Sequence, residues 1–364
     1  MKKLILSLSL LAVSFGSFAQ EETEEKRKFS FSGSVDAYYR TNITAPNDEN
    51  AIAPGSSFAN LPGFALGMIN LVGTYESADG KVGAVADLVF GPRGEDAVFG
   101  SPLYEAFKGG SGGSSQIVNQ LYVYWNVSEK VKLTFGNFNT FLGYEVISPT
   151  GNFNYSTSYM FSYGPFSHTG LKADFDLGSD FSLMLAVMNS TDFTEFNVDG
   201  SYTAGLQLGY KGQYLNFIYG DQTNFTGPNP TVFQVDYTGG FDVSEDFYLG
   251  INATYLTADA GGVDPGFYGV ALYPQYKVSE AFTLGLRGEY FAETDGGAGA
   301  IGAYDIDGDA NVFATTLTGS YEVGDLTIKP ELRLDATSED AFIDSDLAPA
   351  NSLGSFVLGA VYKF

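Results

Sequence analysis

The chain has 364 residues, of which 44% are apolar, 15% aromatic and 17% charged, with a single histidine and no cysteine. The lack of cysteine excludes a disulfide scaffold, and with only His168 available most metal sites built from thiolate or imidazole ligands are excluded as well. The formal net charge of −25 argues against nucleic acid as a partner, because phosphate binding needs a basic surface.

The first segment has the features of an export signal. Lys2 and Lys3 precede an apolar run over residues 4–18, and the small residues Ser17 and Ala19 occupy the positions that signal peptidase reads. We therefore predict a signal peptide over 1–19 and a flexible periplasmic lead-in over 20–28. The apolar run is too short for a spanning helix, and no later window offers the roughly eighteen consecutive apolar residues that one needs.

From residue 28 onward, apolar and polar residues alternate. Phe29, Phe31 and Val35 fall on one face of an extended segment, whereas Ser30 and Asp36 fall on the other. Successive side chains of a strand point to opposite faces, so such a strand has an apolar side and a wet side. We predict sixteen strands of this kind, over 28–40, 63–77, 81–91, 117–127, 130–139, 169–177, 181–189, 202–211, 214–221, 232–243, 247–257, 267–278, 282–293, 312–323, 326–336 and 353–364.

The connections between these segments alternate between tight turns and long loops. Tight turns such as 77–80 and 243–245 alternate with long loops such as 41–62, 92–116 and 140–168. Short periplasmic turns and long external loops are typical of transmembrane barrels, and an even strand count returns both ends to one side. The sequence therefore predicts an all-β, antiparallel up-and-down barrel over 29–364 in the outer membrane of a Gram-negative bacterium.

Aromatic residues give the barrel a predicted thickness. They recur eight positions apart on the apolar faces, as in Phe31/Tyr39 and Phe282/Tyr290. Eight steps of about 3.3 Å span roughly 26 Å along a strand, which suits an apolar band with an aromatic girdle at each edge. Pro274 and Pro330 interrupt two of the segments, and there we expect a bulge or a position near the rim.

The end of the chain resembles the assembly signal of outer-membrane barrels. Gly359 is followed by the aromatic residues Tyr362 and Phe364, although Val357 stands where that signal usually has a polar residue. The resemblance predicts that Phe364 is recognised by the barrel-assembly machinery.

Charged residues on the polar faces must point into the lumen, since a charge cannot face lipid cheaply. This interior must be wet or internally paired. The predicted pore-lining residues are Asp36, Arg40, Lys132, Lys172, Asp174, Asp236, Arg287, Glu289, Lys329, Glu331, Arg333 and Asp335.

The long loops hold most of the excess negative charge, and Lys108 stands almost alone against their acids. A mild preference for cations follows if these acids surround the mouth; solvation of the loops, or bridging by divalent ions at the lipid surface, explains them equally well. Asp305, Asp307 and Asp309 crowd into one short turn. Hard cations such as Ca²⁺ favour such oxygen clusters, although a solvated acidic turn is the favoured interpretation and we predict no other cofactor.

The loop over 140–168 is rich in rings and nearly free of acids, so it should pack against something rather than extend into water. We predict that it folds into the lumen as a constriction; stacking with sugars and contact with a protein remain alternatives. The residues predicted for this constriction are Tyr144, Glu145, Tyr155, Tyr159, Phe166 and His168.

Three runs in this region, 142–147, 152–159 and 165–170, read LGYEVI, NFNYSTSY and PFSHTG. They resemble the central signature of the putative β-barrel porin-2 (OmpL-like) family. The resemblance implies a porin-like outer-membrane barrel and a diffusion channel, but no particular ligand and no catalytic residues.

We therefore predict a non-enzymatic channel through which small hydrophilic solutes diffuse passively, since sixteen strands leave a passage that smaller barrels fill with side chains. Outer-membrane lipids and further copies of the chain are the other expected partners. The alternatives are a structural or adhesive barrel closed by its own loops, a barrel hydrolase that would use His168, and a soluble β-protein.

Overall fold

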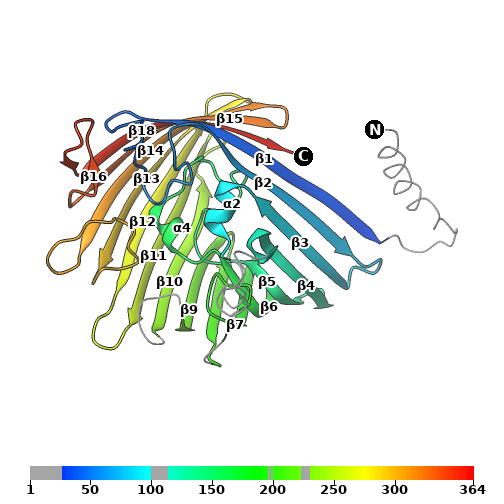
Figure 1. Cartoon of the computed structure of the whole chain (residues 1–364). Helices are drawn as coiled ribbons and strands as arrows, with labels where there is room; N and C mark the ends of the chain where they lie inside the picture. The colour runs from blue at the N-terminus through cyan, green and yellow to red at the C-terminus, as the bar shows by residue number, and fades with distance from the viewer. Residues whose placement is uncertain (1–26, 100–113, 196, 198–199, 223–229) are drawn as a thin grey trace, which may run out of the picture.

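The computed structural model describes residues 27–99, 114–195, 197, 200–222 and 230–364, and sixteen antiparallel strands close into a barrel (Figure 1). The predicted signal peptide lies outside the described residues, as does nearly all of the lead-in. The barrel strands are β1 (Lys28–Asn42), β2 (Gly63–Glu76), β3 (Val82–Phe90), β4 (Val118–Ser128), β5 (Val131–Asn139), β6 (Ser167–Gly178), β7 (Phe181–Met188), β8 (Thr203–Tyr210), β9 (Gln213–Asp221), β10 (Thr231–Asp242), β11 (Phe247–Asp259), β12 (Gly266–Lys277), β13 (Phe282–Thr294), β14 (Ala310–Val323), β15 (Leu326–Thr337) and β18 (Ser352–Lys363).

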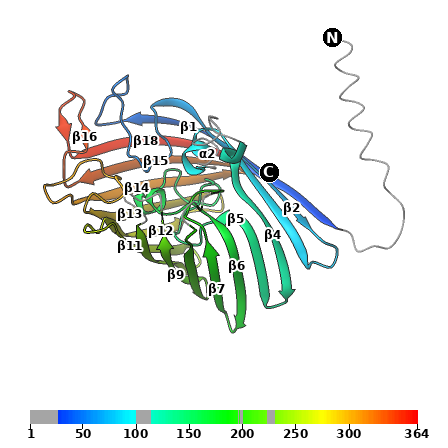
Figure 2. The same cartoon turned by 60° about the horizontal axis from the view of Figure 1, so that its bottom comes forward.

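Every barrel strand pairs with its neighbours along the chain, and β1 closes the ring against β18. The seam runs from Ser34 opposite Lys363 to Asn42 opposite Ser355. Gly33 and Phe364 extend it by exchanging backbone N–H···O bonds of 3.0 Å. The first residues of β1 and the last residues of β18 both lie at the end of the barrel that carries the short turns (Figure 2). Closure pairs the two edge strands with each other along this seam, as a bilayer requires of a spanning sheet.

The sixteen predicted segments each coincide with one barrel strand, and the predicted fold class is confirmed. The shorter elements of the long loops were not predicted, because they are too short to show a periodicity. They are α2 (Pro92–Ala97), the 3₁₀ turn η1 (Ser114–Ile117), α4 (Tyr159–Tyr163) and the two-stranded hairpin β16 (Phe342–Ile343) and β17 (Pro349–Ala350). None of the helices in the described residues is long and apolar enough to cross a membrane.

The two faces of the wall differ as the alternation predicts. Outward side chains are large, apolar and exposed, among them Phe64 at 91% and Leu317 at 41%. Inward side chains are polar and buried, among them Asp36, Arg287 and Glu331. Because the exposed face is apolar and the buried face polar, the barrel is arranged for lipid outside and polar contacts inside.

Pro274 and Pro330 introduce no bulge, and the structure shows the other of the two expected arrangements, a position near the rim. Each pairs normally on one side, with Leu249 and Leu358 respectively. On the other side the ladder is interrupted, and it resumes with an unchanged register. Both prolines lie within four residues of the short-turn end of their strand, so each missing N–H costs one local gap in the ladder and leaves the alternation intact.

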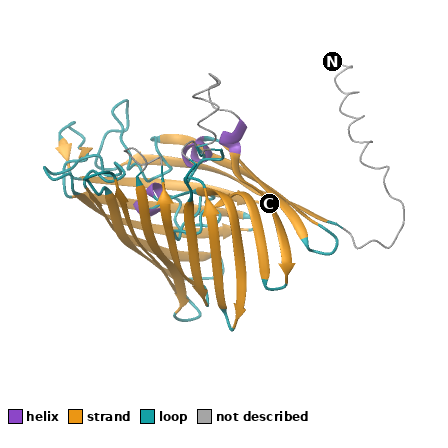
Figure 3. Cartoon of the chain, turned by 90° about the horizontal axis from the view of Figure 1, so that it is seen from below, coloured by secondary structure: helices purple, strands orange, loops and turns teal. Residues whose placement is uncertain are grey.

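The long loops gather at one end of the barrel, whereas tight turns join the strands at the other end (Figure 3). One long loop does not stay outside. Residues 140–166, between β5 and β6, pass into the barrel with α4, and we call them the infolded loop. This loop positions most of the groups that concern function.

Candidate functional site

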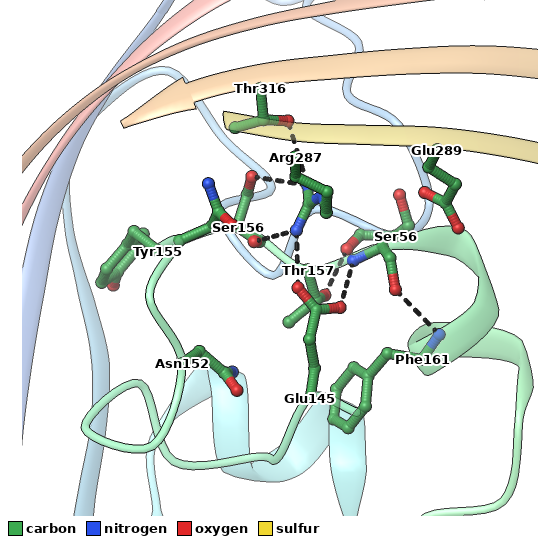
Figure 4. A network of polar contacts seen from close by, with 12 residues as sticks. Ser56, Glu145, Asn152, Tyr155, Ser156, Thr157, Phe161, Arg287, Glu289 and Thr316 are labelled. Carbon is green, nitrogen blue, oxygen red and sulfur yellow. Dashed lines mark hydrogen bonds and ion pairs between the residues drawn. The ribbon is translucent and has the colours of Figure 1, made fainter. Parts of the chain in front are cut away.

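The centre of the lumen holds a buried ion pair between the infolded loop and the wall. Glu145 Oε1 lies 2.7 Å from Arg287 Nη1 of β13, and both side chains are almost fully buried (Figure 4). Arg287 also donates to the Ser156 carbonyl at 2.6 Å and to Thr316 Oγ1 at 3.1 Å. Glu145 Oε2 accepts the Ser158 N–H at 2.7 Å. The Arg287 guanidinium thus holds the Glu145 and Ser156 parts of the loop against β13 and β14.

Two glutamates of the wall accept backbone N–H groups of the infolded loop. Glu331 accepts the N–H of Tyr155 at 2.9 Å and also binds Ser156. Glu289 accepts the N–H groups of Tyr159 and Met160 at 2.9 Å each, at the first turn of α4. A segment without regular structure leaves such donors unpaired, and burying them without partners is costly. These carboxylates are therefore the reason that an irregular loop can lie inside the barrel.

Wall cations bind the carbonyl groups of the same loop. Lys329 Nζ donates to the carbonyls of Pro149 and Asn152, at 2.9 and 2.5 Å. Arg333 donates to the Thr157 carbonyl at 2.9 Å while it pairs with Asp335 at 2.8 Å. The donors and acceptors of the loop backbone are thus matched by charges of opposite type on the strands.

Two aspartates complete the attachment. Asp236 of β10 accepts the Gly143 N–H at 2.9 Å, close to where the loop enters the lumen. Asp36 of β1 accepts the Tyr155 hydroxyl at 2.5 Å. Burial, with the nearby Asp36 carboxylate, raises the pKa of the Tyr155 phenol well above its usual value. The phenol therefore stays protonated and acts as a donor at every physiological pH.

This network changes the role of most predicted pore-lining residues. Nine of the twelve face the lumen but are buried, so they do not line open water. The infolded loop contacts most of them, whereas Arg40 donates to the Ile52 carbonyl of the loop after β1. Lys132, Lys172 and Asp174, on β5 and β6, are the three that keep partial exposure. The buried nine are Asp36, Arg40, Asp236, Arg287, Glu289, Lys329, Glu331, Arg333 and Asp335.

The predicted constriction residues lie as follows. Tyr155, Tyr159, Phe166 and Glu145 are buried in the lumen, and Tyr144 stacks on Tyr273 of β12 with ring centroids 4.3 Å apart. Other loop residues carry as much of the attachment, including Ser156 and Asn152. Sequence reasoning missed them because a polar residue in a loop gives no signal of what it will contact.

His168 is placed in β6 itself rather than in the loop, and it is fully buried. Its Nε2 lies 2.9 Å from Thr140 Oγ1, and its ring lies between Phe138 and Phe141. A hydrolase would need this ring beside a nucleophile and a carboxylate. The described contacts instead give it a threonine hydroxyl and two aromatic rings, so a hydrolytic role finds no support here.

Three sizeable cavities lie along the barrel, and the infolded loop lines two of them. The largest, about 960 Å³, is bounded by the short turns near Lys81, Lys130 and Asp180 and reaches in to Lys132 and Gln207. A second, about 450 Å³, lies on the same periplasmic side beneath residues 149–153. A third, about 440 Å³, lies on the external side of the loop. The infolded loop therefore lies between the external cavity and the second, periplasmic one, whereas the large cavity is lined by other residues.

The acidic turn 305–309 does not gather its carboxylates around one point. Asp305 Oδ1 accepts the N–H groups of Asp307 and Asp309, at 2.9 Å each. Among the described residues no group of three or more histidine, cysteine or acidic side chains is placed to hold a metal ion. The geometry thus lends no support to the predicted Ca²⁺ site.

Comparison with known proteins gives one family and a set of related folds. The family model described as Putative beta-barrel porin-2, OmpL-like matches residues 28–364. No curated protein matches the sequence.

Among solved structures, three outer-membrane barrels cover nearly the whole chain. OmpTΔL8, a loop-deletion mutant of an outer membrane protein of Vibrio cholerae, has a TM-score of 0.59 at 13% identity and covers 93% of this chain and 99% of its own. The outer membrane channel DcaP of Acinetobacter baumannii has a TM-score of 0.58 at 15% identity, covering 95% and 100%. An anion-selective porin from Comamonas acidovorans has a TM-score of 0.57 at 11% identity, covering 93% and 100%. At these identities the similarity shows a shared barrel fold.

Proposed function

Because the chain belongs to the Putative beta-barrel porin-2, OmpL-like family and is a porin-like barrel of the Gram-negative outer membrane, we propose that it is a channel for the passive diffusion of small hydrophilic solutes and ions. A sixteen-stranded barrel is wide enough to enclose a passage. The infolded loop narrows that passage and sets the size of the solutes that cross it.

One observation carries this proposal: the loop is fastened to one part of the wall and leaves a large cavity beside another. Its charged anchors lie on β1, β10, β13 and β15. The cavity of about 960 Å³ lies instead against β4 to β8 and is bounded by short turns at its periplasmic mouth. The solute path is therefore expected to follow β4 to β8.

We also propose a mild preference for cations. The acids that line the large cavity, Asp79, Glu129, Asp174, Asp176 and Asp180, outnumber its lysines, Lys81, Lys130 and Lys132. The long external loops carry a further excess of acids. Negative groups at both ends of a pore raise the local concentration of cations.

Liposome swelling and reversal potentials test these two statements separately. Swelling should be fast in a small sugar such as arabinose and slow in a large one such as raffinose. A KCl gradient should give a reversal potential of the sign for K⁺, larger at low salt because screening is weaker there. Swelling that is independent of solute size would contradict the constriction, and anion selectivity at low salt would contradict the cation preference.

The partners follow from the ends and the outer face of the barrel. We propose that residues 1–19 direct export and are removed after Ala19, and that the assembly machinery reads the C-terminus. Phe364 lies on the seam, where its ring is 6.2 Å from Phe31.

Lipids are the partners proposed for the apolar outer face of the barrel. Association into homo-oligomers is proposed too, and one structural relative, the OmpT of Vibrio cholerae, is described in a trimer form.

A structural or adhesive barrel is the second candidate, and the density of the buried network favours it. If that network seals the lumen under all conditions, the protein would not swell liposomes with any sugar. The strand content measured by circular dichroism shows whether the same preparation is folded. Absence of swelling with folded protein would decide for this candidate.

A further inference from the structure

The cavity of about 440 Å³ on the external side of the infolded loop is enclosed by that loop and two others. Residues 53–60 come from the loop after β1, Asp96 and Phe99 from the segment after β3, and Ser162, Tyr163 and Phe166 from the infolded loop. The volume lies within the range of about 300–1,000 Å³ that is common for small-molecule sites. A solute arriving from outside would reach this space first.

The walls of this cavity are held in place before any ligand arrives. Arg93 of α2 donates to the carbonyls of Ile147 and Tyr155, at 2.8 and 3.0 Å, which ties the helix to the infolded loop. The Ser56 carbonyl accepts the hydroxyls of Thr157 and Ser162, at 2.6 and 3.2 Å. These contacts join all three loops, so little ordering is left for a ligand to bring about, and that favours binding.

One wall of the cavity is aromatic. Phe58 meets Phe166 edge to face at 6.1 Å, and Phe99 stacks on Phe166 at 6.0 Å. Phe99 keeps 48% of its surface exposed. Tyr163 adds a fourth ring to the lining. The Arg93 guanidinium already lies over the Phe58 ring, 5.4 Å from its centroid. The rings of Phe99 and Tyr163 are the ones that can accept the apolar part of a ligand and attract a cation through their faces.

The charge in the lining is negative. Asp96 carries it, and its Oδ2 accepts a hydrogen bond of 2.6 Å from Asn60 Nδ2, which fixes the carboxylate. No lysine or arginine lines the cavity in the described part of the chain. Two of the polar groups in the lining are already engaged, because the Asn60 amide binds Asp96 and the Ser162 hydroxyl binds Ser56. Charge and apolar contact, rather than a pattern of hydroxyl contacts, are what the site offers.

We propose that this cavity is a binding site for a small organic cation, with its ammonium group beside Asp96 and its apolar body against the rings. The proposal rests on the proposed channel function, because such a cation would be a solute captured at the external entrance. It adds to that function a class of solute and the residues that select it.

Two probes of equal shape test the role of charge. Choline and its uncharged carbon isostere, 3,3-dimethyl-1-butanol, are titrated into the purified full-length protein in detergent micelles, and binding is followed by saturation-transfer NMR and calorimetry. Choline should bind about fivefold or more tightly than the isostere. The Asp96→Asn variant should lose that difference while it keeps its weak affinity for the isostere. The Asp305→Asn variant, which removes an acid of another external loop, should bind choline like the parent protein.

Equal affinity for choline and its isostere would overturn the proposal, as would an unchanged choline affinity in Asp96→Asn or tighter binding of maltose than of choline. Phe99→Ala should weaken both probes, because it removes an exposed ring and leaves the carboxylate. K⁺ conductance of the same preparation distinguishes failure of the cation site from failure of the channel function. If the protein conducts K⁺ but does not bind choline, only the cation site is contradicted. If it does not conduct K⁺, the channel function is contradicted.

Discussion

Arg287 and Glu145 are 142 positions apart in the chain and form an ion pair of 2.7 Å inside the barrel, with both side chains buried. One belongs to the wall and the other to the infolded loop. A buried pair costs desolvation when it forms, but removing one partner leaves a charge without compensation and is far more costly. The pair therefore makes the position of the loop and the integrity of the lumen depend on each other.

The Glu145→Ala variant should be strongly destabilised. It leaves the Arg287 guanidinium buried without its carboxylate, and the expected loss in the free energy of unfolding is about 3–5 kcal/mol. Urea unfolding of protein inserted in lipid vesicles measures it. Asp340→Asn, in an exposed loop, is the control and should leave the unfolding midpoint unchanged. Equal midpoints for the two variants would mean that the ion pair does not hold the loop.

Locking the infolded loop to the wall should not abolish conductance, because the loop is already fixed. Asn154 Nδ2 donates to Thr318 Oγ1 of β14 at 2.7 Å, and both residues are buried. The chain has no cysteine, so the double variant Asn154→Cys/Thr318→Cys offers only one intramolecular disulfide. Its conductance should be the same before and after reduction, and the two single variants should show no response to reductant. A channel that opens only on reduction would identify the loop as a moving gate.

Thiol reagents should locate the solute path. Lys132 lines the large cavity, whereas Thr318 is fully covered by the infolded loop. In Lys132→Cys, a charged methanethiosulfonate reagent added on the periplasmic side should reduce conductance substantially. Thr318→Cys should not react and should not respond. Modification and block at Thr318→Cys instead would place the path on the opposite wall.

A charge placed on the outer face should cost stability only at membrane depth. Leu317 lies near the middle of β14, faces outward and is 41% exposed. Leu317→Arg should lower the free energy of unfolding from vesicles by about 2–4 kcal/mol. Asp325→Arg, in a short turn outside the apolar band, should cost much less. Similar losses for both variants would contradict the assignment of the outer face to lipid.

The strands of the barrel wall can be predicted from the sequence. Apolar and polar residues alternate over about ten residues in each strand, because each strand must present one face to lipid. Phe247–Asp259 begins where the alternation predicts and extends only two residues further. Even the two prolines left the register unchanged. Strand identity is therefore a local property of this chain.

The contents of the lumen could be predicted only in part. The crowd of rings in 140–166 indicates that this segment is buried, but no pattern says that Glu145 meets Arg287 or that Lys329 meets the carbonyl of Pro149. Those partners are set by loop geometry over more than a hundred residues. For the same reason the charges of the wall could be assigned to the lumen by parity, but parity gave no sign that the infolded loop covers Arg333 and leaves Lys132 partly exposed.

The most direct test of the account is the single-channel conductance of the purified, correctly folded protein in a planar bilayer. We expect discrete steps in KCl that are smaller than those of the Glu145→Ala variant wherever that variant still inserts, because loosening the infolded loop widens the path. Bilayers that stay silent with the parent protein, or steps of equal size in both proteins, would contradict a channel narrowed by this loop.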